Sequence, residues 1–194
     1  ALRYPKGPLP PPDLFPASSS PLEAGRAEVL AQGPPGALEV LLLAYGGAVE
    51  HAARARGLLL AGGIEAGLVN ARFAKPLDEE TLGKCLAEVP LVVTIEDGAL
   101  AGGFGSAVAE LMTRRGERAE VVALGVPDVF LEHGSREELL REVGLDARGI
   151  ARSVQDALAL IRARNQVPRP SPDGPLAGVA PRVTKAGFGR LSPP

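Results

Sequence analysis

Residues 91–95, with the sequence Leu-Val-Val-Thr-Ile, show the clearest strand pattern in the chain. They are apolar and mostly β-branched, which is typical of a strand buried within a sheet. Glu96 and Asp97 follow at once and are expected to close the strand. The glycine-rich turn Gly102–Ser106 then opens an apolar helical pattern that extends to about Arg114. A strand followed by a loop and a helix is the repeating part of a βαβ unit.

The chain on both sides of this segment repeats the same alternation. Short apolar runs bounded by glycine or proline alternate with longer helical patterns. Because parallel neighbouring strands need helical crossovers, this order predicts a three-layer α/β/α sandwich with a mostly parallel sheet over residues 37–163. The other expected strands are 38–44, 67–71 and 120–124, and the expected helices are 49–61, 78–88, 102–114, 135–144 and 146–163.

Prolines mark the two ends of the chain. Of its 19 prolines, nine lie in residues 1–36 and seven in residues 164–194. The first stretch is expected to contain an extended linker, and the second to be a disordered tail. Within the first, Glu23–Ala31 fits either a short edge strand or a helical turn. Since the chain begins without Met or a secretion signal, we expect it to be a fragment or a processed product.

Composition excludes several classes of protein. A net charge of -2 and an aromatic content of 4% disfavour nucleic-acid binding. One cysteine, Cys85, excludes an intramolecular disulfide, and with only His51 and His133 it cannot form an ordinary zinc site. No apolar run approaches the roughly 20 residues of a membrane-spanning helix. A reducing cytoplasm is the expected compartment, with no membrane partner.

Two neighbouring features could carry chemistry at the end of the 91–95 strand. Glu96 and Asp97 stand where open α/β sheets usually place ligands, so an acid/base role competes with capping of the next helix or an intersubunit hydrogen bond. Adjacent strand residues point in different directions, which favours capping. The Gly102–Ser106 turn could cradle a phosphate, but its order is not G-x-G-x-x-G, which favours close helix packing.

The remaining candidates are isolated side chains. His133 lies in the loop after residues 120–124 with no nucleophile beside it, which indicates a surface or interface residue. Cys85 fits a small core residue on its helix. Arg3 and Lys6 flank a proline and could hold a phosphate. His51, within a helix, carries no functional signal.

Five separated stretches, in matching order and spacing, resemble the C-terminal part of the 1-deoxy-D-xylulose-5-phosphate synthase family. The resemblance covers most of residues 37–160. The wider group of thiamine-dependent, transketolase-like enzymes shares the R-x-x-x-P-L-D element and the glycine-rich turn. The stretches are Arg3–Gly7, Ala71–Asp78, Thr94–Asp97 with Gly102–Ser106, Leu124–Phe130 and Val143–Asp146.

The resemblance implies an enzyme that condenses pyruvate with glyceraldehyde 3-phosphate, releasing carbon dioxide. Its product, 1-deoxy-D-xylulose 5-phosphate, serves isoprenoid, thiamine and pyridoxal synthesis. Thiamine diphosphate supplies the carbanion chemistry, and Mg²⁺ anchors its diphosphate. Enzymes of this family have three domains, and this chain corresponds to the third. The resemblance implies that this domain is a structural and dimer-supporting module of a cytoplasmic homodimer. It lacks the G-D-G…N cofactor element, so the chain alone is expected to bind neither cofactor and to be inactive.

The resemblance implies one substrate-binding residue in this chain. Arg3 corresponds to the first arginine of the family's R-Y-P-R-G element, which contacts the acceptor phosphate, and its guanidinium suits a bidentate contact. The second arginine is Lys6 here, which loses the fork geometry, so no specific contact is assigned to it. The implied domains are 1–7, the end of the pyrimidine-binding domain; 8–36, an interdomain linker; 37–163, the transketolase C-terminal-like domain; and 164–194, the tail, which the family does not explain.

Two alternative identities remain open at this point. The chain could be the equivalent domain of a transketolase or of a 2-oxo-acid dehydrogenase β subunit, although the Gly-x-Pro-Asp-x-Phe motif at 125–130 favours the synthase. It could instead be a free-standing module whose Gly102–Ser106 loop binds a nucleotide or another anion.

Overall fold

A computed structural model describes residues 10–11, 14–15, 22–34, 36–87 and 89–166 of the chain. Strands and helices alternate through most of this part. The strands are β1 (Glu28–Ala31), β2 (Val40–Tyr45), β3 (Ala66–Asn70), β4 (Leu91–Ala99) and β5 (Glu120–Val126). The helices are α1 (Ala48–Ala61), α2 (Glu79–Leu86), α3 (Phe104–Arg115), α4 (Arg136–Glu142) and α5 (Ala147–Gln166).

The strands form one sheet in the order β1-β3-β2-β4-β5. The pairs β2–β3, β2–β4 and β4–β5 are parallel, and only β1 is antiparallel to its neighbour β3. The predicted mostly parallel sheet is confirmed. Parallel pairing places the carboxyl ends of β2, β3, β4 and β5 at one edge, where open α/β sheets usually carry their functional residues.

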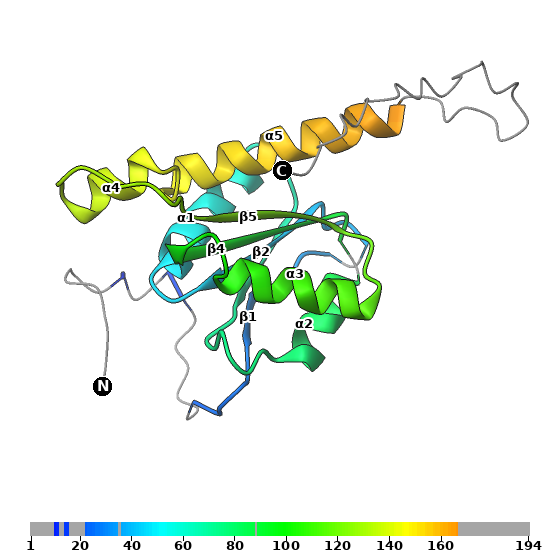
Figure 1. Cartoon of the computed structure of the whole chain (residues 1–194). Coiled ribbons are helices and arrows are strands. Elements are labelled where there is room, and N and C mark those ends of the chain that lie inside the picture. The colour runs from blue at the N-terminus through cyan, green and yellow to red at the C-terminus, as the bar shows by residue number, and fades with distance from the viewer. Residues whose placement is uncertain (1–9, 12–13, 16–21, 35, 88, 167–194) are drawn as a thin grey trace, which may run out of the picture.

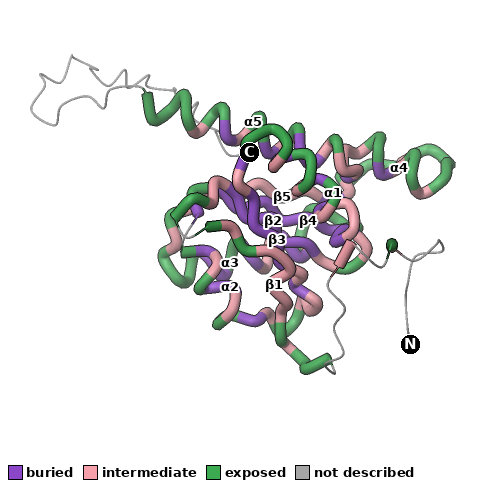
Figure 2. Tube along the Cα trace, turned by 180° about the vertical axis from the view of Figure 1, so that it is seen from behind, coloured by how far each residue is buried: buried purple, intermediate pink, exposed green. Residues whose placement is uncertain are grey.

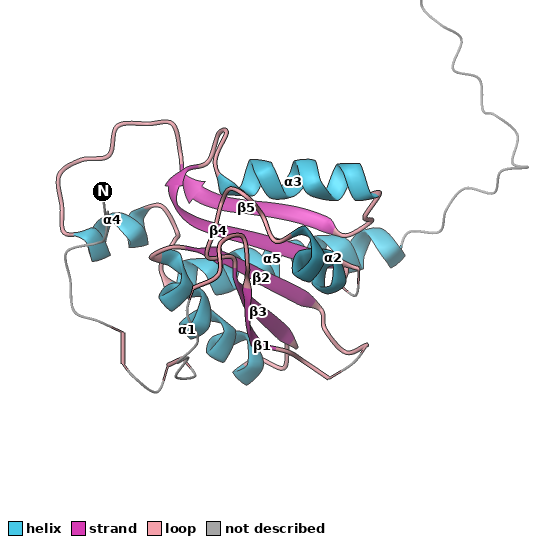
Figure 3. Ribbon diagram, turned by 90° about the horizontal axis from the view of Figure 1, so that it is seen from below, coloured by secondary structure: helices cyan, strands magenta, loops and turns pink. Residues whose placement is uncertain are grey.

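Helices cover both faces of the sheet, as Figures 1 and 3 show. One apolar cluster joins α1, α4 and α5 to one face, and its members Leu59, Ile150 and Val154 are fully buried. A second cluster packs α2 and α3 on the other face, with Leu82 and Val108 fully buried. The predicted three-layer sandwich is therefore confirmed. In Figure 2 the buried strands lie between the layers, and the last turn of α5 is exposed.

Local sequence signals explain where several helices begin and end. The Asp78 carboxylate caps α2 by accepting a hydrogen bond from the Thr81 N–H. Ser135 and Glu138 form the expected capping box at the start of α4. Gly116 ends α3 in the left-handed conformation, with φ of 69°, which glycine adopts without strain.

Three expected boundaries need correction. Residues 28–31, inside the expected 8–36 linker, form β1, because they pair with β3 and complete the sheet edge; this decides for the edge strand. β4 does not close at Asp97 but continues to Ala99, where the irregular pairing with β5 resumes opposite Val126. α5 continues to Gln166, three residues beyond the predicted domain end, and Arg164 pairs with Glu120 of β5 at 2.8 Å. Residues 167–194 of the expected tail lie outside the described residues.

Across the described ranges, we find no helix long and apolar enough to cross a membrane.

Candidate functional site

Glu96 lies on β4, and its carboxylate reaches the first turn of α3. The residue is only 5% exposed. One carboxylate oxygen accepts a hydrogen bond from the Phe104 N–H and the other from the Gly105 N–H, both at 2.9 Å. The first N–H groups of a helix have no partner within the helix and form its positive end, so the carboxylate stabilises the start of α3. The capping interpretation of Glu96 is confirmed.

The glycines of the turn make this close approach possible. A Cβ at Gly103 would overlap the Ala99 carbonyl oxygen and would lie 2.5 Å from a Glu96 carboxylate oxygen. A Cβ at Gly105 would lie 2.6 Å from the Thr94 hydroxyl, which is buried and has no hydrogen-bond partner within the described part of the chain. The turn therefore serves close packing. Because Glu96 already occupies two of its N–H groups, this geometry argues against a nucleotide or anion site here.

Asp97 points away from Glu96 and fixes a different element. Its carboxylate pairs with the Arg136 guanidinium of α4 at 2.7 Å, with both side chains about one third exposed. This pair connects the end of β4 to the start of α4. His51 of α1 also lies near Arg136; burial lowers the pKa of its imidazole, and the positive charge of Arg136 lowers it further. His133 is exposed in the loop before α4.

The loop between β5 and α4 stands at the same carboxyl edge. The Leu100 N–H donates to the Val126 carbonyl at 2.9 Å, which brings the ends of β4 and β5 together. Residues 97–101 and 126–128 line an open cavity of about 400 Å³. Immediately after it, Val129 and Phe130 are large apolar side chains that contact little of the domain. This edge thus exposes two large apolar side chains, Val129 and Phe130, and not a cluster of reactive groups.

The stretch Ala71–Asp78 contacts β1 and the residue before it, at the β1 end of the sheet. Arg72 of this stretch pairs with Glu28 of β1 at 2.8 Å, and its own backbone is left-handed, with φ of 56°. Asp78 accepts a hydrogen bond from the Ala27 N–H at 3.0 Å in addition to capping α2. Burial by itself raises the pKa of Asp78, but hydrogen bonds from Thr81 and Ala27 outweigh it, so the pKa lies below its usual value.

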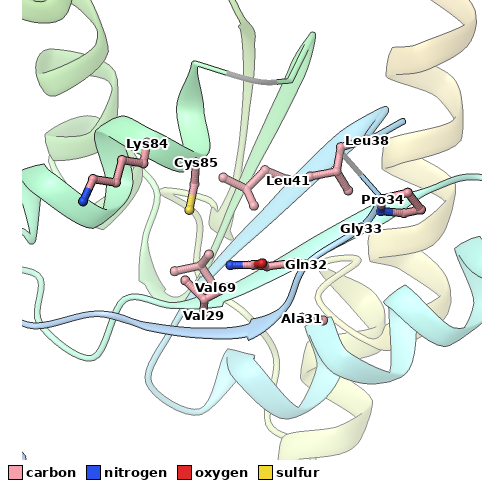
Figure 4. Close-up of a pocket in the computed structure, with 10 residues that line it drawn as sticks. All are labelled: Val29, Ala31, Gln32, Gly33, Pro34, Leu38, Leu41, Val69, Lys84 and Cys85. Atoms are coloured by element: carbon pink, nitrogen blue, oxygen red, sulfur yellow. The ribbon is translucent and has the colours of Figure 1, made fainter. Parts of the chain in front are cut away.

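A second cavity, of about 330 Å³, lies between β1 and α2, as Figure 4 shows. Its walls are mainly apolar side chains such as Leu41 and Val69, and Cys85 is turned toward the same space. The Lys84 ammonium at its margin is paired with Glu80 at 2.9 Å. The cavity opens near the start of β2, at the edge opposite the carboxyl ends of the parallel strands, and offers no cluster of reactive groups.

The residues selected from the sequence are therefore not assembled into one catalytic site. Arg3 and Lys6 lie outside the described residues. Cys85 is half-buried beside the α2 and α3 cluster rather than in the core. In the ranges that the structure describes, no three His, Cys, Asp or Glu side chains are grouped to hold a metal ion.

Several long-range contacts and the cavity at β1 could not be predicted from the sequence, two contacts at the site among them. The Asp97–Arg136 pair joins residues 39 positions apart, and the Ala27–Asp78 hydrogen bond joins residues 51 apart. The cap signal of Asp78 is local and does not point to Ala27, and no spacing pattern pairs Asp97 with Arg136, because such contacts are created by the order of the strands in the sheet.

Comparison with known proteins identifies the class. The family described as "Transketolase, C-terminal domain" matches residues 25–150. The chain belongs to this family.

The curated relatives narrow the comparison further. The chain is 46% identical over 155 residues to the 1-deoxy-D-xylulose-5-phosphate synthase of Synechococcus sp. (strain JA-2-3B'a(2-13)), and 42% identical over 160 residues to that of Aquifex aeolicus (strain VF5). These matches cover 80% and 81% of this chain but 23% and 24% of the relatives. The chain thus spans about a quarter of the length of the relatives that it matches.

Two solved structures share the fold. A structure described as "Split gene transketolase, inactive beta4 tetramer" matches with a TM-score of 0.66 and 36% identity, over 75% of this chain and 45% of that one. Transketolase from Pichia stipitis, in complex with sedoheptulose 7-phosphate, matches with a TM-score of 0.54 and 19% identity, over 72% of this chain and 19% of that one. The second likeness concerns the fold alone.

Proposed function

We propose that this chain is the C-terminal domain of a 1-deoxy-D-xylulose-5-phosphate synthase. The observation that carries the proposal is the match, over about 80% of the chain, to synthases of which the matched part is only about a quarter. The longer enzyme condenses pyruvate with glyceraldehyde 3-phosphate, releases carbon dioxide and forms 1-deoxy-D-xylulose 5-phosphate for isoprenoid, thiamine and pyridoxal synthesis. We place it in the cytoplasm as a homodimer.

Within that enzyme, the domain has a structural and dimer-supporting role. Its charged groups at the carboxyl edge are used inside the fold: Glu96 caps α3, Asp97 pairs with Arg136, and Arg72 pairs with Glu28. The split-gene transketolase structure is described as an inactive β4 tetramer, which is consistent with a part of such an enzyme that assembles without catalysing the reaction.

The chain by itself is proposed to bind neither thiamine diphosphate nor Mg²⁺. A diphosphate with Mg²⁺ needs oxygen ligands for the cation and free donors for the phosphate oxygens. In the Gly102–Ser106 turn two N–H groups are occupied by Glu96. Among the described residues, no three His, Cys, Asp or Glu side chains are grouped to hold a metal ion. We therefore assign both cofactors to the other domains of the longer enzyme.

A turnover assay tests this function. The 194-residue chain, supplied with both substrates, thiamine diphosphate and Mg²⁺, should form no product. A hybrid polypeptide, in which this chain follows the preceding three quarters of the Synechococcus relative, should form 1-deoxy-D-xylulose 5-phosphate. Turnover by the chain alone, or a hybrid that folds with cofactor bound but yields only transketolase or acyl-transfer products, would refute the proposal.

For Arg3 we propose a contact with the phosphate of glyceraldehyde 3-phosphate, supported by its place in the Arg-Tyr-Pro-Lys-Gly stretch. In the hybrid, Arg3→Ala should raise the KM for glyceraldehyde 3-phosphate at least about tenfold, because a charge-assisted contact to a dianion is lost. The KM for pyruvate should change little. Lys6→Ala is the matched control, with a smaller effect; equal increases in both KM values for Arg3→Ala would exclude the assignment.

A further inference from the structure

The loop between β5 and α4, residues 127–134, exposes apolar side chains that the isolated domain does not use. Phe130 is fully exposed and Val129 is 62% exposed. Leu100, at 36%, is hydrogen-bonded through its backbone to Val126, directly before the loop. Three of the six exposed large hydrophobic residues in the described part of the chain thus gather at one edge. The other three are Leu22, Leu58 and Leu160.

The loop is held in place at both ends. The Val126 carbonyl, directly before the loop, accepts a hydrogen bond from the Leu100 N–H at 2.9 Å, and the Ser135 capping box fixes the start of α4 after the loop. The Asp97–Arg136 pair then ties that start to β4. A side chain presented from an anchored loop loses less conformational freedom on binding than one on a free segment, which favours a specific contact.

The negative charge of the loop indicates which kind of protein surface could bind it. Residues 127–134 contain two carboxylates, Asp128 and Glu132, both exposed, and no lysine or arginine. A second copy of this chain would present the same acidic edge and the same projecting Phe130, so like charges would face each other across a two-fold contact. The complementary surface is an apolar socket for an aromatic ring with lysine or arginine at its rim.

We propose that residues 127–134 are the docking element by which this domain binds the preceding part of its own longer enzyme, with Phe130 inserted into an apolar socket with a basic rim. This inference rests on the proposed function. The chain spans about a quarter of the length of its relatives. The other three quarters of the enzyme could therefore provide the surface that covers this edge. Phe130 is the anchor, and Asp128 and Glu132 meet the rim.

Hydrogen exchange tests the proposal in the hybrid polypeptide and in the chain alone. Amides of residues 127–134 should exchange at least about tenfold more slowly in the hybrid, because docking excludes water from the loop. The end of α5, residues 162–166, is exposed but lies outside the docking element, and it should exchange equally in both. Phe130→Ser should abolish the protection in the hybrid, whereas Leu160→Ser, an equivalent loss of exposed apolar surface on α5, should not.

Each contrary outcome has a separate meaning. Equal exchange of the loop in an active hybrid and in the chain alone would overturn the docking site while leaving the proposed function standing. A hybrid that folds with cofactor bound but has no synthase activity would refute the proposed function, and with it the docking site that rests on it. If light scattering shows that the isolated chain is a dimer and that Phe130→Ser makes it a monomer, the loop binds a second copy, and the proposed partner is wrong.

Discussion

The Glu96 carboxylate occupies the position at the start of α3 where a bound anion would otherwise accept two backbone hydrogen bonds. Its neighbour Asp97 points outward and pairs with Arg136 instead. Two adjacent carboxylates thus have unrelated roles, because successive side chains of a strand lie on opposite sides. Glu96 and Asp97 are adjacent in the sequence, but in the structure they contact different elements.

At the residue scale, we expect Glu96→Ala to lower the free energy of unfolding by about 2–4 kcal/mol, because two buried N–H groups lose their acceptor. Asp97→Ala is the matched control and should cost no more than about 1 kcal/mol, since its ion pair is partly exposed. Urea unfolding of the two variants measures both values. Equal losses would contradict the assignment of Glu96 as a buried cap.

At the scale of the elements, Asp78 joins two segments that are distant in sequence, the start of α2 and the residues before β1. It caps α2 and accepts a hydrogen bond from Ala27, just before β1. Arg26, the residue before Ala27, also lies 3.7 Å from the Asp78 carboxylate. The short edge strand β1 is thereby held to the helix that packs below the sheet.

The lowered pKa of Asp78 predicts a pH dependence of stability. A carboxylate whose pKa is lower in the folded state stabilises the fold above its unfolded value of about 3.9, and this contribution disappears as the pH falls through the folded value. Asp78→Asn should therefore be about 1–2 kcal/mol less stable than the wild type at pH 7, with a difference that shrinks below about pH 4.

Urea unfolding between pH 2.5 and 7, in roughly half-unit steps, measures this difference. Glu79→Gln, which removes an exposed carboxylate from the same turn of α2, is the control and should change stability by less than about 1 kcal/mol at neutral pH. A difference between wild type and Asp78→Asn that is constant across the range would exclude a role for the Asp78 charge.

At the scale of the whole molecule, α5 is the longest helix of the described residues, and it packs against α1 on one face of the sheet. Its buried side chains Ile150, Val154 and Leu158 are spaced four residues apart, and they pack with α1 against the strands. The same helix exposes Leu160 on its outer side. The stability effects of a buried and an exposed apolar side chain can therefore be compared within one helix.

We expect Ile150→Ala to reduce the free energy of unfolding by about 2–4 kcal/mol, because it leaves a cavity in a fully buried position. Leu160→Ala, at 66% exposure, should change it by no more than about 0.5 kcal/mol. Denaturant unfolding of each variant provides the comparison. Similar losses for the two positions would show that α5 does not pack on the sheet as described.

Local patterns in the sequence were sufficient for most elements. The β-branched run at 91–95, the Asp78 cap and the Ser135 capping box each depend on neighbours within a few residues, so their positions could be predicted. β1 could not be assigned, because four half-buried residues form a strand only where β3 offers an edge. The end of β4 was misplaced for the same reason, since Ala99 pairs with Val126 of β5.

Periodicity, helix caps and motifs are local or ordered along the chain, so they were enough to predict the α/β class, the sandwich architecture and the family resemblance. The roles of the motif residues depend instead on contacts that exist only in the folded domain. Glu96 caps a helix, Asp97 anchors α4, and Phe130 projects from the domain, because the order of the strands fixes which distant groups meet and which are left uncovered.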